Sequence, residues 1–230
     1  MSKEKYFNFP IQLLSGFLTN SHTVLNNITD FAIYENSLKL ELGTEEDKMK
    51  ASANIFNLTL TNPKRSSENG KLLYNSISQK SPRTGLSRSM FFDFYQDEQS
   101  EFEKVCLLAF LAIKSIIGNK AYCKVTNHYL WARMDGKTTT IETPEHLTPE
   151  LMKYANRYQT ENIKNELILN WSLIYYSRYT RGFYVSYKLS LEDLIFEAEK
   201  KRKSTKEKQQ NSLQKEALKR ALERLSKEPP

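Results

Sequence analysis

The chain has 230 residues, and its 34 Lys and Arg exceed its 27 Asp and Glu, which gives a formal net charge of +7 at pH 7. This excess of positive charge favours polyanionic partners. With only seven glycines and seven prolines, the composition excludes collagen-like, low-complexity and loop-dominated chains and predicts a mainly helical protein.

Export and membrane insertion are not expected from the sequence. The N-terminus has two lysines, but no apolar run of seven or more residues follows them, so it does not resemble a secretory signal. The longest apolar run, 105–113, stops at Lys114 and is about half as long as a bilayer span. Cys106 and Cys123 are the only cysteines, so no disulfide framework is expected. We therefore expect a cytoplasmic protein that does not bind membranes.

Residues 1–88 are predicted to form an N-terminal helical region. Helices are expected to begin at Pro10, after a cap at Ser21 or Thr23, and at Glu45, because Pro suits the first helical position and Ser or Thr the N-cap. Segments 62–70 and 79–85 are rich in turn-forming residues and predict loops. The apolar positions of the three helices recur at helical spacing: Ile11, Leu14, Phe17 and Leu18; Val24, Leu25, Ile28, Phe31 and Ala32; Ala51, Ile55 and Leu58.

The strongest helix signal in the sequence lies at about 101–117. Asp97 or Ser100 can cap its N-terminus, and Gly118-Asn119 can end it. The aromatic run 90–95 before it is either a short strand or a packing segment. The helix carries a broad apolar face and is expected to be buried on most sides: Phe102, Val105, Cys106, Leu108, Ala109, Ala112, Ile113 and Ile116.

The next elements follow in a defined order. Residues 121–125 alternate like a short strand, and Thr126 or Asn127 can cap a helix over 128–134. The polar stretch 137–149 resembles an insertion, and 150–156 lies between it and the next helix. That helix is predicted to begin at Thr160, with Ile163, Glu166, Leu167 and Leu169 at helical spacing. Two β-rich segments, 171–177 and 183–188, are joined by a turn of hairpin length at 178–182.

This order resembles the winged helix-turn-helix DNA-binding superfamily, especially the replication and regulatory proteins of phages and plasmids. Tyr122-Cys-Lys-Val-Thr-Asn-His-Tyr-Leu-Trp-Ala-Arg-Met-Asp-Gly136 is similar to the strand and second helix of the family, and Thr160–Asn170 to its recognition helix. Leu173–Tyr176 and Gly182–Tyr187 are similar to its wing. The resemblance covers residues 97–190, and it departs from the family at the turn between the second and third helices, which is about twenty residues instead of a few.

The resemblance implies two sets of DNA-contacting residues. In the docking mode of the family the third helix enters the major groove, which assigns base contacts to Gln159, Glu161, Asn162, Lys164 and Asn165. The alternative is an ordinary solvated face, which the carboxylates Glu161 and Glu166 favour because phosphates repel them. The wing offers Arg178, Arg181 and Lys188 to phosphates, or else has a solvated tip.

A basic helical tail is expected over residues 200–230. Its run Lys200, Lys201, Arg202 and Lys203, followed by Lys206 and Lys208, can neutralise phosphates without sequence preference, or it is a solvated charged face. An apolar stripe follows at helical spacing and predicts docking or self-association, including a homodimer: Leu213, Ala217, Leu218, Ala221, Leu222 and Leu225.

No arrangement of residues predicts catalysis. The glycines are never closer than fifteen residues apart, which excludes P-loop and dinucleotide-binding patterns. Tyr154 and Tyr158 have the spacing of paired nucleophilic tyrosines, but the metal-binding histidine pair that accompanies them is missing, since His22, His128 and His146 are far apart in sequence. The cysteines and histidines lack zinc-site spacing. We expect no catalytic residue, metal or cofactor.

The sequence therefore predicts a mainly α protein with a small β wing. It divides into an N-terminal helical region (1–88), a winged-helix-like domain (89–199) and a basic helical tail (200–230). The first hypothesis for its function is a non-enzymatic protein that binds double-stranded DNA, as a replication initiator or transcriptional regulator of a mobile element. The second is a protein–protein adaptor that uses the winged helix as a scaffold. A third, an unrecognised nuclease, requires carboxylates that only the fold brings together.

Overall fold

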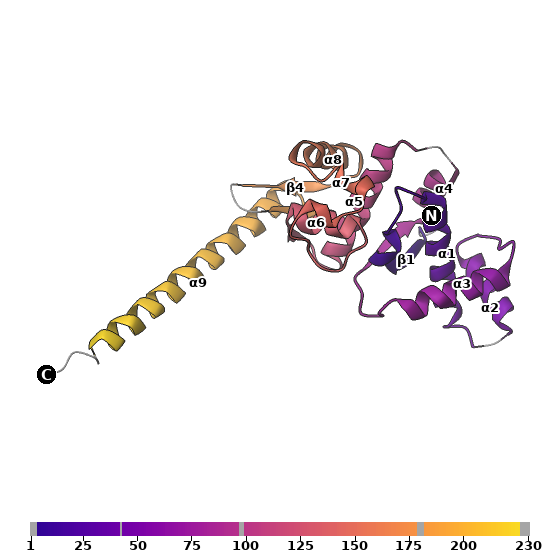
Figure 1. Ribbon diagram of the computed structural model, residues 1–230, viewed down its shortest axis with the longest axis horizontal. Helices are drawn as coiled ribbons and strands as arrows, with labels where there is room; N and C mark the ends of the chain where they lie inside the picture. Colours follow the sequence, from indigo (N-terminus) through magenta and orange to yellow (C-terminus); the bar gives the residue numbers. More distant parts are fainter. Residues whose placement is uncertain (1–3, 42, 97–98, 179–181, 226–230) are drawn as a thin grey trace.

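The computed structural model describes residues 4–41, 43–96, 99–178 and 182–225, with side chains described as far as residue 220. In these ranges the chain is mainly helical and has two small antiparallel sheets, which confirms the predicted class at that level. The N-terminal elements lie at one end, helices α5 to α8 in the middle, and the long helix α9 extends away at the other end (Figure 1).

The first half surrounds a two-stranded sheet. Strand β1 (Tyr6–Pro10) pairs with β2 (Arg83–Ser87), with Tyr6 opposite Ser87. Along the chain, the two strands are separated by the 3-10 helix η1 (Ile11–Leu14) and by helices α1 (Ser21–Ser37), α2 (Glu45–Ile55) and α3 (Pro63–Ser76). Helix α4 (Arg88–Gln96) follows β2 directly.

Several predictions about this half are wrong in detail. Pro10 ends a strand and precedes a 3-10 helix, so no α-helix begins there. Asn20, which precedes both predicted caps, caps α1. In α2, Ala51 and Ile55 are exposed. The buried residues of α2 and its C-cap are instead Met49, Ser52, Ala53 and Phe56.

The predicted loop 62–70 forms the first half of α3. The Asn62 side chain accepts the backbone N–H of Arg65 at 3.0 Å, and Pro63 occupies the first turn. Gly70 lies inside the helix because α3 packs closely on α1: a Cβ at this position would lie 2.6 Å from the Asp30 carbonyl oxygen. The turn-forming residues of this segment therefore cap and pack a helix.

Two further segments differ from their predictions. Residues 79–85 were predicted as a loop, but β2 begins within them at Arg83. The aromatic run 90–95 lies in helix α4, where Phe91 and Phe94 are buried, so it is a packing segment and not a strand.

Helix α5 (Glu101–Ile117) is the centre of the structure. Ser100 and Glu103 form a capping box at its start, while Asp97 lies outside the described residues. Gly118 has a φ of 55° and ends the helix. The buried residues of α5 belong to a single hydrophobic cluster that runs from Phe7 to Val185. The core therefore crosses residue 88 without a break.

The second half contains the three-stranded sheet. After α5 come β3 (Cys123–Val125), α6 (Asn127–Met134), η2 (Pro144–His146), α7 (Pro149–Met152) and α8 (Arg157–Asn170). Strands β4 (Ile174–Tyr176) and β5 (Phe183–Ser186) precede α9 (Leu191–Leu225). The strand order is β3-β5-β4, and both pairings are antiparallel.

Helix α9 is continuous through the boundary predicted at residue 200. Leu194 and Ala198 are buried at its start, where it packs against β4 and β5. Every residue from 200 to 220 is exposed. Among the described residues, no helix combines the length and the apolar character that crossing a bilayer requires.

Candidate nucleic-acid interface

Helix α8 begins earlier than its sequence predicts. Asn156 is the N-cap, and its side chain accepts the backbone N–H of Gln159 at 2.9 Å. Thr160, the predicted cap, is buried inside the helix. Its hydroxyl donates to the Asn156 carbonyl at 2.6 Å and accepts the Trp131 indole N–H at 3.1 Å. Thr160 therefore joins α8 to α6.

In the long connection between α6 and α8, a contact joins the residues at the two ends of the predicted insertion 137–149. The Asp135 carboxylate, after α6, accepts the backbone N–H of Thr148 at 3.2 Å and its hydroxyl at 2.8 Å, and it pairs with Lys137. Ile141 and Leu147 in the connection are buried. The insertion is thus anchored by Asp135 and by two buried side chains, while most of its other residues are exposed.

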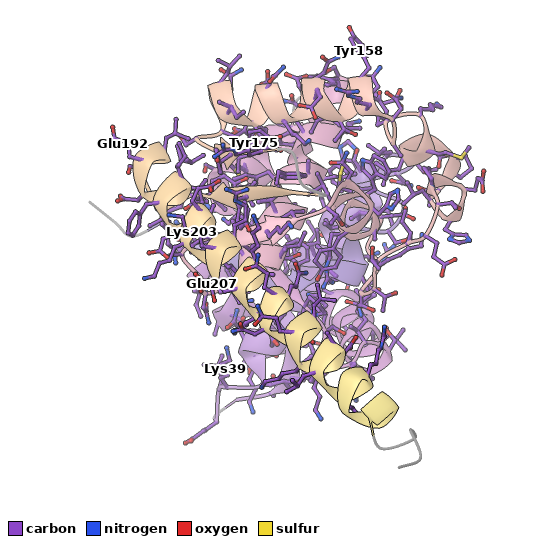
Figure 2. All side chains as sticks on the ribbon, turned by 90° about the vertical axis from the view of Figure 1, so that its left-hand side faces the viewer. Lys39, Tyr158, Tyr175, Glu192, Lys203 and Glu207 are labelled. Carbon is purple, nitrogen blue, oxygen red and sulfur yellow. The ribbon has the colours of Figure 1, made fainter. Side chains whose placement is uncertain are left out.

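One face of α8 packs inward and the other faces solvent. Ile163 and Leu167 are buried on the side that contacts α5. Tyr158 points away from the body of the protein (Figure 2) and is 72% exposed. The exposed side chains of α8 include Arg157, Tyr158, Glu161, Asn165, Ile168 and Leu169.

The predicted base-contacting residues divide between these faces. Glu161 and Asn165 are exposed, and Gln159 and Asn162 are half-buried. Lys164 is buried, with 3% of its surface exposed, so its prediction as an outward residue is wrong.

The burial of Lys164 has a clear physical basis. Its ammonium lies 4.2 Å from the ring centroid of Phe183 and 5.4 Å from that of Tyr175, both in the β4–β5 hairpin. It also donates to Glu161 Oε1 at 2.8 Å. A carboxylate and two aromatic faces replace the water that a buried ammonium loses.

Two more residues of α8 differ from the sequence analysis. Leu169, predicted to lie with the apolar face, is 78% exposed. Arg157 belongs to the exposed first turn and was missed because the helix was predicted to begin at Thr160. Asn156 was the available signal, since Asn is among the strongest N-cap residues.

The hairpin contacts α9 through a carboxylate. Glu199 Oε1 accepts the Tyr176 hydroxyl at 2.8 Å and lies 3.7 Å from Arg178. Glu199 Oε2 pairs with Arg202 at 2.8 Å. The hydrogen bond from Tyr176, together with the two guanidinium groups, lowers the pKa of Glu199, against a smaller opposing effect of burial. Two of the predicted phosphate-contacting residues, Arg178 and Arg202, are therefore paired with a carboxylate.

The other predicted phosphate-contacting residues are exposed where the structure describes them. Lys188 is exposed after β5, and Arg181 lies outside the described residues. Lys200, Lys201 and Lys203 are exposed on α9, and Figure 2 shows Lys203 on α9 between Glu192 and Glu207. Because the adjacent Glu199 accepts the Tyr176 hydroxyl of β4, the cations at 200–203 follow the part of α9 that contacts the hairpin.

A hollow of about 570 Å³ lies between the start of α6, α8 and the hairpin. Its walls include Asn127 and His128 from α6 and Ser177 from the hairpin, and Glu161 and Lys164 line it from α8. The hollow places hydrogen-bond donors and one carboxylate beside the exposed face of α8.

No family model, curated protein or solved structure matches the chain.

Metal binding and cysteine reactivity can be assessed for the described residues. No group of three His, Cys, Asp or Glu side chains among them is placed to hold a metal ion. Both cysteines are buried, and burial raises the pKa of Cys106 to about 12 and that of Cys123 to about 11. Since the thiolate is the reactive form, these thiols are poor nucleophiles at neutral pH.

Proposed function

We propose that the chain is a winged helix-turn-helix protein that binds double-stranded DNA and acts by occupancy, without catalysing a reaction. The observation that carries the proposal is the order of elements α5, β3, α6, α8, β4 and β5 with β5 in the middle of the sheet. The superfamily that the sequence resembles has the same order of elements. In this proposal α8 is the recognition helix and β4–β5 is the wing.

The position of α8 supports this assignment. Its apolar face packs on α5, and its exposed face carries Arg157, Glu161 and Asn165. Of these, Glu161 lines the hollow that α8 shares with the hairpin. A helix that enters the major groove needs such a polar outer face, because base edges are read by hydrogen bonds. Gln159 and Asn162, which are half-buried, stand at the edges of this face.

The exposed cations would supply most of the affinity. Lys188 follows the wing, and Lys200, Lys201 and Lys203 lie on the first exposed turns of α9. Contacts of this kind bind phosphates without reading sequence. By its resemblance, we propose that the protein serves a mobile element as a replication initiator or transcriptional regulator, with α9 as its dimerisation element.

The proposal is tested by fluorescence anisotropy with a labelled random duplex at 50 and 200 mM salt. If six or more phosphates are contacted, affinity should fall by about a thousandfold or more over this range. The triple variant Lys200→Gln, Lys201→Gln, Lys203→Gln should bind more weakly and with a shallower salt dependence. A control that removes three exposed cations from the N-terminal helices, Lys50→Gln, Lys64→Gln, Lys71→Gln, should bind nearly as the parent does. Absence of duplex binding at 50 mM salt would refute the proposal.

Exposed apolar side chains favour a second candidate, the protein–protein adaptor. Leu169 on α8 is 78% exposed, and Leu213 and Leu218 on α9 are each 65% exposed. Large apolar side chains that gather on a surface mark sites of protein contact. An adaptor would not bind the duplex, and its affinity for a protein partner would change little between the two salt concentrations.

A further inference from the structure

The exposed face of α8 carries a carboxylate, Glu161, that pairs with a buried lysine of the same helix. Glu161 is one turn before Asn165, and both are exposed. Glu161 Oε1 accepts the Lys164 ammonium at 2.8 Å, while 48% of the Glu161 side chain is exposed to solvent. The pair therefore joins an exposed acceptor to a buried donor.

Lys164 is itself fixed by the hairpin. Only 4% of its side chain is exposed, and its ammonium lies over the Phe183 ring at 4.2 Å. A lysine on a solvated surface samples many rotamers, whereas packing against two rings restricts this one. The orientation of Glu161 consequently depends on the β4–β5 hairpin as well as on α8.

The ion pair changes what this carboxylate does near DNA. An isolated carboxylate on a recognition helix is repelled by phosphates, and the ammonium at 2.8 Å offsets that repulsion. Lys164 occupies one oxygen of Glu161, Oε1, which leaves Oε2 as a hydrogen-bond acceptor on a side chain that is 48% exposed. In the major groove an acceptor of this kind is matched by the exocyclic amino group of cytosine.

We propose that Glu161 reads a cytosine through its N4 amino group, and that Lys164 is the positioning residue that orients the carboxylate for this contact. The inference rests on the proposed function, because it requires α8 to lie in the major groove. Glu161 then contributes directly to sequence recognition, and the buried Lys164 contributes indirectly by orienting Glu161.

The test is selection from a randomised duplex library followed by sequencing, with affinities then measured on the selected site and its single-base variants. The parent protein should require cytosine at one position, with a loss of about tenfold or more for the other bases. Glu161→Ala should abolish the preference at that position. In Glu161→Gln the amide oxygen should face Lys164 and the amide N–H groups should face the groove, so the preference should change to a base that presents an acceptor.

Lys164→Met separates positioning from folding. The variant keeps an unbranched side chain and should fold with the far-ultraviolet circular dichroism of the parent. Its preference for cytosine should fall to less than about a third of the parental ratio. Because Glu161 loses its ammonium partner, affinity for non-cognate duplex should also fall, but by a smaller factor than affinity for the cytosine site. Glu166→Gln is the matched control for Glu161→Gln: it removes the same negative charge from α8 at a half-buried residue that pairs with Asn170, and it should leave base preference unchanged.

The outcomes distinguish this inference from the proposed function. If Glu161→Gln binds more tightly to all duplexes with the parental base preference, Glu161 only repels phosphates and the inference is wrong while DNA binding stands. The same conclusion follows if Lys164→Met weakens binding to all duplexes equally. If the parent does not bind duplex DNA at low salt, the proposed function itself fails.

Discussion

Glu199 restrains two cations that the proposed interface would use. Its carboxylate lies 2.8 Å from Arg202 and 3.7 Å from Arg178. About half of each arginine side chain is exposed to solvent, 47% for Arg202 and 52% for Arg178. Glu199→Gln removes the negative charge but keeps an oxygen that can accept the Tyr176 hydroxyl. We expect the variant to bind DNA more tightly than the parent.

The size of this effect follows from the number of cations released. Each additional phosphate contact steepens the dependence of log K on log salt by about 0.9, which corresponds to about eightfold in affinity at 0.1 M salt relative to 1 M. Release of one arginine therefore predicts about an eightfold gain, and release of both about sixtyfold. Folding stability should change little, since exposed ion pairs contribute little.

The measurement is anisotropy with one duplex at several salt concentrations between 50 and 200 mM. Glu192→Gln is the control, because it removes the same charge from an exposed position on the same helix, away from Arg178 and Arg202. Equal gains for the two variants would show that only net charge matters. An unchanged salt slope in Glu199→Gln would refute the reasoning that its partners become available to phosphates.

Three further predictions concern folding stability and are checked by urea unfolding. Gly70→Ala should cost about 1–3 kcal/mol, because its Cβ would lie 2.6 Å from the Asp30 carbonyl; an unchanged midpoint would mean that α1 and α3 are not packed so closely. Thr160→Val should cost about 1–3 kcal/mol, because the buried Trp131 N–H loses its acceptor, and a cost below 0.5 kcal/mol, which is about the scatter of surface substitutions, would contradict this. Burial raises the pKa of the Asp30 carboxyl above its ordinary value, so its contribution to stability is greatest below that value and is lost as pH rises through the raised pKa. Asp30→Asn should therefore be more stable than the parent at pH 7 and equal to it at pH 3, and a gain that is the same at both pH values would exclude titration of Asp30 as its cause.

Elements whose signals are local were predictable from the sequence. Helix α5 has a capping box at Ser100 and Glu103 and a continuous apolar pattern that ends at Gly118, and each of these signals lies within a few residues. The apolar positions of α1 from Val24 to Ala32 are buried as predicted. The order of strand, helix, helix and hairpin after α5 was likewise visible in the periodicities.

Features that depend on distant partners were not predictable. A Pro, two Ser and a Gly within nine residues predict a loop, and only the close approach of α1 explains why Gly70 lies inside a helix. Lys164 has the composition of a surface residue, and its burial depends on Phe183, nineteen positions later in the sequence, in the hairpin. The pairing of Glu199 with Arg178 likewise depends on α9 packing against β4.

The same dependence explains why the long connection between α6 and α8 is compatible with the proposed docking mode. A short turn fixes the relative orientation of two helices by its own backbone geometry. With a connection of this length, the orientation of α8 relative to α6 depends on other contacts. Here the Trp131 to Thr160 hydrogen bond joins the two helices directly, and Asp135 anchors the connection through Thr148. Loss of either contact should alter which face of α8 is presented before it alters whether α8 is helical, because the cap at Asn156 is local.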